Sequence, residues 1–299
     1  MAKHLCSRRC SILTMRSNPI KIWAYLLLPM LFIASAAVAQ RSTVDNINPY
    51  RVIQRSTLHG VSLLNTLDTY LSGFDYRGGG YHVQHETLRK AHTGSYDWIY
   101  QTRTDATLGI SKLRSSARIT FMASRKWSGY HPFEINKKFK ILLGPQLKAE
   151  CGVLYAPSYG NNPVSAKVNA SLGASAIAVY AFNVKDKEYK ARYTLDLPLV
   201  GAMFAPEYGQ SYYEIFGLGD TDNIIQISTP INSPSFTQSL SLDVPMKNSK
   251  LRFAYMIDIY QSDVNSLRTH IYTHSFSVGY ARTIYKVKRH DPIEAYLPL

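Results

Sequence analysis

Apolar and polar side chains alternate along most of the chain with a period of two residues. Residues 189–203 show the alternation most clearly. A β-strand directs alternate side chains to opposite faces, so this period predicts strands that have one apolar and one polar face. In residues 189–203 the apolar set is Tyr189, Ala191, Tyr193, Leu195, Leu197, Leu199 and Met203, and the polar set is Lys190, Arg192, Thr194 and Asp196.

Twelve segments are predicted to be strands. The eighth and ninth are short, and ten strands remain if these two belong to a loop. Their ranges are 64–76, 79–91, 96–110, 116–129, 137–156, 164–184, 187–205, 210–219, 223–229, 235–246, 250–262 and 269–286.

Most of these segments are long enough to cross a membrane as tilted strands, which takes about 9–11 residues. Strands of soluble β-sandwiches are usually about 5–6 residues long. The chain has 22 tyrosines, many of them near the segment ends, as in the aromatic girdles of membrane barrels. We therefore expect an all-β fold, a transmembrane antiparallel up-and-down β-barrel of about twelve strands (alternative ten). A secreted soluble β-sandwich that acts as a binding module is the alternative fold.

The N-terminus has the features of an export signal. Residues 1–21 carry five cations and no acid, residues 22–34 are apolar, and Ala37 and Ala39 form an A-x-A cleavage site before Gln40. Either Met1 or Met15 is the start. We expect a signal peptide over 1–39, a periplasmic lead-in or small plug over 40–60, and the barrel over 61–299. The expected location is the outer membrane of a Gram-negative bacterium, and the expected partners are outer-membrane lipid, barrel-insertion machinery and periplasmic chaperones.

Charge and cysteine content exclude some other classes. The formal net charge is +14, of which five cations lie in the signal. The remaining cations are spread over many segments, so no nucleic-acid role is predicted. Cys151 is the single cysteine after residue 39, so the expected mature chain has no internal disulfide. Oligomeric state is not readable from the sequence.

The polar faces of the segments predict a charged lumen. Mixed charges of this kind either neutralise one another in a packed interior or line a narrow channel, and the sequence leaves both open. The expected lumen-facing residues are Glu86, Arg103, Asp105, Arg118, Lys140, Lys148, Glu150, Lys167, Lys190, Arg192, Asp196, Asp243, Arg252 and Asp258.

Histidines are the candidates for catalysis or metal binding. His82 and His85 are three residues apart, so on a strand they point to opposite faces and do not share a metal. A lipid hydrolase would need a serine next to His82, His85, His270 or His274, and no G-x-S-x-G occurs. No catalytic residue, metal or cofactor is therefore predicted. Gly78–Gly80 is expected to be a loop, with no helix after it to cradle a phosphate.

Three strings carry a resemblance to a known family. They are Phe204–Phe216 (FAPEYGQSYYEIF), Leu67–Ser72 (LDTYLS) and Ser275–Tyr280 (SFSVGY). The sequence resembles an uncharacterised Bacteroides-type family, domain of unknown function 3316, over most of the mature chain. The resemblance implies an outer-membrane-type barrel without an established activity. The expected function is an outer-membrane barrel serving as envelope structure or a narrow solute passage, with a lipid-modifying hydrolase of that membrane as the alternative.

Overall fold

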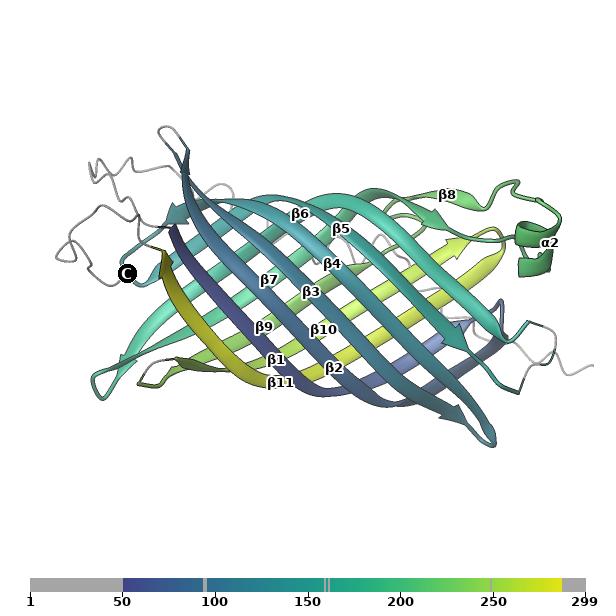
Figure 1. Cartoon of the computed structure of the whole chain (residues 1–299), viewed down its shortest axis with the longest axis horizontal. Helices are drawn as coiled ribbons and strands as arrows, with labels where there is room; N and C mark the ends of the chain where they lie inside the picture. Colours follow the sequence, from purple (N-terminus) through teal and green to yellow (C-terminus); the bar gives the residue numbers. More distant parts are fainter. Residues whose placement is uncertain (1–50, 94–95, 159, 161, 248, 287–299) are drawn as a thin grey trace, which may run out of the picture. The chain divides into compact units, whose positions relative to one another are not determined.

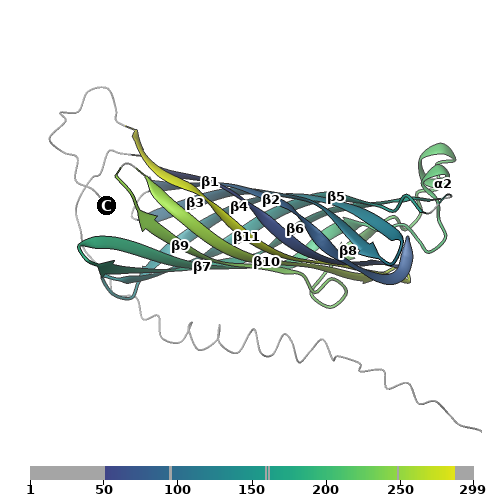
Figure 2. The same ribbon diagram turned by 90° about the horizontal axis from the view of Figure 1, so that it is seen from below.

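The computed structural model describes residues 51–93, 96–158, 160, 162–247 and 249–286. Within this part of the chain, ten antiparallel strands form one closed ring (Figures 1 and 2). Strand β11 pairs with β1, and β6 pairs with β7, so the sheet closes on itself and has no free edge along the ring. The strands of the ring are β1 (Arg51–Asp68), β2 (Ser72–Thr93), β3 (Tyr96–Leu113), β4 (Ser116–Glu134), β5 (Phe139–Tyr155), β6 (Val164–Val184), β7 (Lys187–Phe204), β9 (Phe236–Pro245), β10 (Lys250–Val264) and β11 (Leu267–Lys286).

The predicted barrel is confirmed, and the soluble β-sandwich is wrong because two separate sheets are absent from the described strands. The preferred count of twelve is corrected to the alternative of ten. The eighth segment expected, 210–219, contains the short helix α2 (Tyr212–Gly217), and the ninth contains the four-residue strand β8 (Ile225–Ser228), which pairs only with the end of β7. Pro206 and Gly209 interrupt the alternation there, which is why this stretch leaves the ring.

The first strand also starts earlier than predicted. Residues 51–60, which were assigned to the lead-in or plug, form the first part of β1 and pair with β11 along their whole length. The predicted strand 64–76 instead contains the turn between β1 and β2. The signal segment 1–39 and residues 40–50 lie outside the described residues.

The predicted loop at Gly78–Gly80 is wrong, because these glycines lie within β2. A Cβ at Gly80 would come within 2.4 Å of the Leu108 carbonyl oxygen and 2.7 Å of the Gly109 Cα on β3. Glycine therefore allows the two backbones to approach closely where the wall curves. Turn-type residues do not always mark a turn in a barrel wall.

The two faces of the wall differ in chemistry. Outward positions are mainly apolar, and polar side chains fill many of the inward positions, where they are buried. This inverted arrangement is that of an outer-membrane-type barrel, whose exterior contacts lipid. No helix in the described part of the chain is both long enough and apolar enough to cross a membrane. Exposed apolar side chains of the outer wall include Val61, Leu63, Leu108, Ile110, Phe121, Leu147, Val168, Leu172, Leu240, Phe253, Phe276 and Val278.

The two ends of the barrel are unequal. At the end where β1 begins and β11 finishes, short turns join the strands, and Lys185 and Asp186 of the β6–β7 turn both have positive φ. At the other end lies the longest connection, residues 205–235, which contains α2 and β8 and extends past the strands (Figure 1). We call residues 205–235 the excursion. Barrels of this class have short periplasmic turns and longer extracellular loops, and by this rule we name the end with the excursion the extracellular end and the opposite end the periplasmic end.

Candidate functional site in the barrel interior

The middle of the interior holds four acidic and four basic side chains. They come from six strands, and each occupies an inward position of the alternation. Their formal charges cancel, which is the condition for burying so many ionised groups together. The eight residues are Glu86 on β2, Arg103 and Asp105 on β3, Lys126 on β4, Arg192 and Asp196 on β7, Asp243 on β9 and Arg252 on β10.

Glu86 is the centre of one half of this network. Its Oε2 lies 2.7 Å from Nη1 of Arg252 and 2.7 Å from Nη2 of Arg192. The Arg252 guanidinium also forms a two-pronged pair with Asp243, with Nε–Oδ1 at 2.5 Å and Nη2–Oδ2 at 2.8 Å. Four strands are thereby joined through the lumen by the most directional type of ion pair.

Asp196 is the centre of the other half. Its Oδ1 lies 2.6 Å from Nζ of Lys126 and accepts a hydrogen bond from Ser175 at 2.5 Å. Its Oδ2 lies 3.0 Å from Nη2 of Arg103, whose Nε lies 2.8 Å from Asp105. This half links β3, β4, β6 and β7.

Two neutral side chains connect the halves. The Tyr130 hydroxyl donates to Oε1 of Gln101 at 2.6 Å, and Nε2 of Gln101 donates to Glu86. Lys126 donates to the same tyrosine hydroxyl at 3.4 Å. The interior charges therefore form one continuous hydrogen-bonded structure, which we call the central network.

A second set of ion pairs lies nearer the extracellular end. Lys148 lies 2.5 Å from Glu150 and 3.6 Å from Asp258. Lys167 lies 2.9 Å from Asp68 at the end of β1, and its Nζ also donates to Thr269 at 3.0 Å. These pairs join strands that lie on different sides of the ring.

A small buried apolar cluster lies on each side of the central network along the barrel axis. Toward the extracellular end a buried cluster contains Leu71, Leu154, Ala156, Tyr260 and Ile271. Toward the periplasmic end another contains Tyr130, Leu142 and Ile177. The eight charged side chains of the central network are themselves buried or nearly so, which favours a packed interior at their level.

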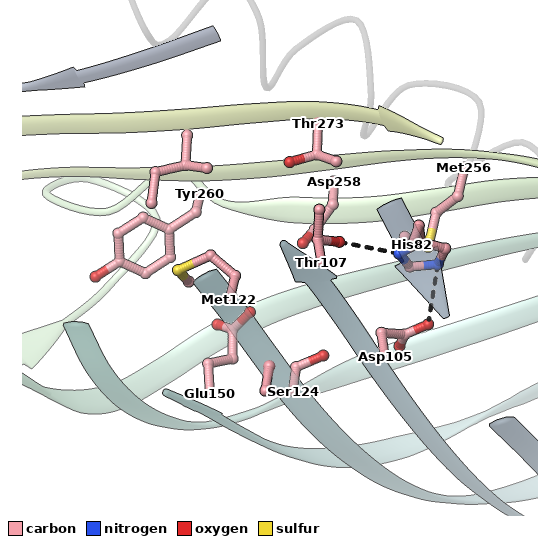
Figure 3. Close-up of a pocket in the computed structure, with 12 residues that line it drawn as sticks. His82, Asp105, Thr107, Met122, Ser124, Glu150, Met256, Asp258, Tyr260 and Thr273 are labelled. Atoms are coloured by element: carbon pink, nitrogen blue, oxygen red, sulfur yellow. Dashed lines mark hydrogen bonds and ion pairs between the residues drawn. The ribbon is translucent and has the colours of Figure 1, made fainter. Parts of the chain in front are cut away.

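A small cavity remains beside His82, with a volume of about 20 Å³ (Figure 3). His82 is buried, its Nδ1 lies 2.9 Å from the Thr107 hydroxyl, and its Nε2 lies 3.9 Å from Asp105. Glu150 and Asp258 line the same space. A volume of this size holds about one water molecule. It is too small for an organic substrate, so His82 is a satisfied interior histidine.

Of the fourteen sequence-predicted lumen residues, two lie at the periplasmic mouth and twelve lie inside the barrel. Lys140 and Lys190 occupy inward positions at the periplasmic mouth, where they are partly exposed and pair with Glu134 and Glu188. Arg118 is fully buried, with its guanidinium carbon 4.2 Å from the ring centre of Tyr76. The other eleven of the fourteen lie inside the barrel: Glu86, Arg103, Asp105, Lys148, Glu150, Lys167, Arg192, Asp196, Asp243, Arg252 and Asp258.

Two interior charges were missed by the sequence reasoning. Lys126 shares the inward face of β4 with Arg118, Thr120 and Ser128, so the alternation within 116–129 contained the signal. Asp68 was missed because the predicted first strand continued through the turn that follows it. Nothing in the local sequence indicates that Lys126 binds Asp196, which is 70 residues away.

The other candidate histidines, His85, His270 and His274, face outward. His85 contacts the Thr57 hydroxyl at 3.0 Å, His274 contacts the Tyr255 hydroxyl at 2.8 Å, and His270 lies 2.9 Å from Asp75. In the described part of the chain none of these histidines has a serine as its hydrogen-bond partner, and no group of three or more potential ligands could hold a metal ion. The histidine geometry therefore offers no nucleophile–base pair.

The closed ring, apolar exterior and charged interior define an outer-membrane-type β-barrel. The family model "Protein of unknown function (DUF3316)" matches residues 24–291, and the chain belongs to this family. No curated protein sequence matches the chain.

Solved structures similar to the barrel include three bacterial proteins. The outer membrane protease OmpT from Escherichia coli is 8% identical, with 83% of this chain and 100% of that chain covered and a TM-score of 0.39. Neisserial surface protein A is 10% identical, with coverages of 79% and 98% and a TM-score of 0.31. An outer membrane channel from Pseudomonas putida F1 is 7% identical, with coverages of 82% and 100% and a TM-score of 0.36.

Proposed function

We propose that this protein is a sealed barrel of a Gram-negative outer membrane that anchors the excursion at the cell surface and does not conduct solutes. The observation that supports this proposal most strongly is the neutral, buried central network, whose ion pairs join distant strands across the lumen. The proposal selects envelope structure over narrow solute passage, which the sequence left open.

The outer wall supports the membrane location. Apolar side chains dominate its outward positions, and exposed aromatic side chains such as Tyr100, Trp127 and Tyr180 lie toward the periplasmic end of their strands. Aromatic rings at such levels are favourable at the boundary between hydrocarbon and head groups. Export through a signal peptide over 1–39, followed by periplasmic chaperones and barrel-insertion machinery, is the route that this location requires.

The excursion is held against the barrel by several polar contacts. The Tyr70 hydroxyl donates to the Gln210 carbonyl at 2.9 Å, and burial raises the pKa of Tyr70 to about 12. The Tyr212 hydroxyl accepts from the Ala166 amide at 2.6 Å, and the Asn265 side chain donates to the Ala205 carbonyl at 2.6 Å. These contacts reach strands on several sides of the ring, so the barrel positions the excursion as a fixed surface.

The composition of the excursion differs from that of the rest of the chain. It contains four acidic residues and no lysine, arginine or histidine, although the whole chain carries +14. Large apolar side chains are exposed on it, among them Tyr208, Tyr213 and Phe216, each more than 70% exposed. Exposed apolar groups of this size are typical of interaction surfaces. This favours presentation of a surface as the role of the barrel.

The hydrolase alternative has less support. It requires a serine, a histidine and an orienting acid within hydrogen-bond reach. His82 has its acid at 3.9 Å but is enclosed in the lumen with a threonine as its partner, and the outward histidines contact Thr57, Tyr255 and Asp75. We therefore retain the non-enzymatic proposal.

Conductance across a planar lipid bilayer tests the sealed lumen. The protein is first shown to be folded by a band on a denaturing gel that shifts on boiling, which is a sign of a closed barrel. This protein is expected to give no steady current, and Arg192→Ala is also expected to give none. A steady current from the natural protein that changes in Arg192→Ala overturns the sealed barrel.

Surface labelling of whole cells tests the anchoring of the excursion. Cys151 is replaced by serine, and a single cysteine is placed at Tyr208 in the excursion or, as the matched control, at Asp186 in the β6–β7 turn. A membrane-impermeant maleimide is expected to label Tyr208→Cys and not Asp186→Cys. The reverse pattern overturns the assignment of the extracellular end.

A further inference from the structure

Two arginines on the outer wall are direct cross-strand neighbours. Arg55 on β1 lies opposite Arg282 on β11, and both side chains are exposed at outward positions near the periplasmic end. Like charges placed directly opposite each other on a sheet repel, so this pair costs stability unless an anion lies between the two side chains. In the described part of the chain neither arginine has an acidic partner.

The surroundings of this pair add a third cation and no acid. Arg89 on β2 is exposed at an outward position and lies opposite Ile53, two residues from Arg55. The outward positions of the described strands around the pair contain no aspartate or glutamate over 53–61 of β1, 81–89 of β2 and 274–284 of β11. No group of the wall itself therefore neutralises the arginines.

A hollow in the wall lies at the same place and combines cationic and apolar lining. Arg55, Arg282, Thr57 and His85 provide polar groups. Its apolar lining includes Leu251, Val278 and Ile284. Val278 lies four residues from Arg282 toward the middle of β11, and Phe276 and Val61 continue the apolar surface in that direction.

We infer that this hollow binds an anionic phospholipid of the periplasmic-side leaflet. The two guanidinium groups of Arg55 and Arg282 hold its phosphate, and Leu251 and Val278 contact its acyl chain. Planar guanidinium groups match the geometry of a phosphate and hold it through paired hydrogen bonds. On β11, Val278 lies farther from the periplasmic end than Arg282, and Leu251 lies opposite Tyr280 between these two levels. An acyl chain that contacts Leu251 and Val278 therefore extends from the arginines toward the membrane interior, whereas Ile284 lies on the boundary side of Arg282. The inference takes the membrane location from the proposed function and does not depend on the sealed lumen.

Native mass spectrometry of detergent-extracted, boiling-sensitive protein tests the site. The probes are phosphatidylglycerol and phosphatidylcholine with the same acyl chains. The natural protein is expected to retain more phosphatidylglycerol, and R55Q/R282Q is expected to lose that preference by about tenfold. The matched control is R268Q, since Arg268 is an exposed arginine of β11 at the opposite end, and it is expected to behave as the natural protein.

Three results would overturn the inference. The first is that the natural protein shows no preference for phosphatidylglycerol over phosphatidylcholine. The second is that folded R55Q/R282Q keeps the preference unchanged. The third is that glycerophosphate displaces the lipid completely, which would indicate a site for a free anion. If the double variant does not give the boiling-sensitive band, R55Q and R282Q are compared singly by the same criteria. If the barrel conducts ions and still prefers phosphatidylglycerol, the proposal of a sealed lumen is wrong and the inference of a lipid site stands.

Discussion

Arg252 and Glu86 meet across the barrel interior, with Nη1 of the arginine 2.7 Å from Oε2 of the carboxylate. The two residues are 166 positions apart, and their strands, β10 and β2, are separated in the wall by β1 and β11. The contact therefore passes through the lumen and not along the sheet. It belongs to the central network that fills the barrel.

Replacement of Glu86 should be strongly destabilising. Glu86→Gln leaves Arg252 and Arg192 without their shared anion inside the barrel, and breaking a buried pair in this way costs about 3–5 kcal/mol. The free energy of unfolding is measured by urea titration in lipid vesicles, with the folded fraction at each urea concentration read from the boiling-sensitive gel band. Asp222→Asn in the exposed part of the excursion is the control and should stay within about 0.5 kcal/mol of the natural protein. Equal stability of the two variants would contradict the role given to the network.

The pair should also be energetically coupled. Removing both partners, in Glu86→Ala with Arg252→Ala, leaves neither member of this pair facing a missing counterion, although Arg192 still loses Glu86 and Asp243 still loses Arg252. The double variant should therefore lose at least about 1 kcal/mol less than the sum of the two single losses. A double-mutant cycle by urea unfolding gives this number. Strict additivity would mean that the two groups do not interact in the membrane-embedded protein.

Alanine should be tolerated differently at two glycines of the same strand. A Cβ at Gly80 meets the Leu108 carbonyl oxygen at 2.4 Å, whereas a Cβ at Gly73 has no atom within 4 Å. Gly80→Ala must push β2 and β3 apart and should cost about 1–3 kcal/mol, in the range seen for overpacking. Gly73→Ala should be close to neutral. The refolding yield of each variant is measured as the fraction of protein in the boiling-sensitive gel band. Similar yields for Gly80→Ala and Gly73→Ala would mean that the wall relaxes freely at Gly80.

The start of α2 should loosen in acid. The Ser211 amide donates to the Glu214 carboxylate at 2.6 Å, and the Glu214 amide donates to the Ser211 hydroxyl at 3.2 Å, which is a capping box. The hydrogen bonds from Ser211 lower the pKa of Glu214 below its ordinary value of 4.5. A lowered pKa means that this contribution is complete above pH 4.5 and is lost as the pH falls through the lower value of the folded protein.

Hydrogen exchange of the amides in α2 follows this loss. Protection of these amides should fall at acid pH in the natural protein. In Glu214→Gln the protection factors, which are corrected for intrinsic exchange, should stay constant over the same pH range. Ser211→Ala should show weakened protection at every pH. Unchanged protection in Ser211→Ala would mean that the excursion contacts, and not the cap, hold the helix.

The alternation of side chains determined the fold class and the face of most charged residues. Arg103, Lys148 and Asp196 could be placed in the lumen because each alternates with apolar neighbours along its strand. Those neighbours face lipid, so the charged residues face the opposite way. Alternation does not show whether a segment belongs to the ring, so two ring strands were wrongly predicted within 210–229. The start of β1 was missed because the polar residues Thr57 and His59 occupy outward positions, where apolar residues were expected. Those two polar residues belong to the same wall as Arg55.

Only the tertiary structure decided which charges meet and how deeply they are buried. Period-two patterning fixes a face but not a partner, since the pairing of Arg252 with Glu86, or of Lys126 with Asp196, depends on ring closure and on the relative heights of distant strands. The same closure brings Arg55 beside Arg282, because β1 and β11 become neighbours only when the ring is complete. The sequence by itself determined a barrel with a charged interior. The burial of that interior follows from the number of strands and the side chains that they bring to each level.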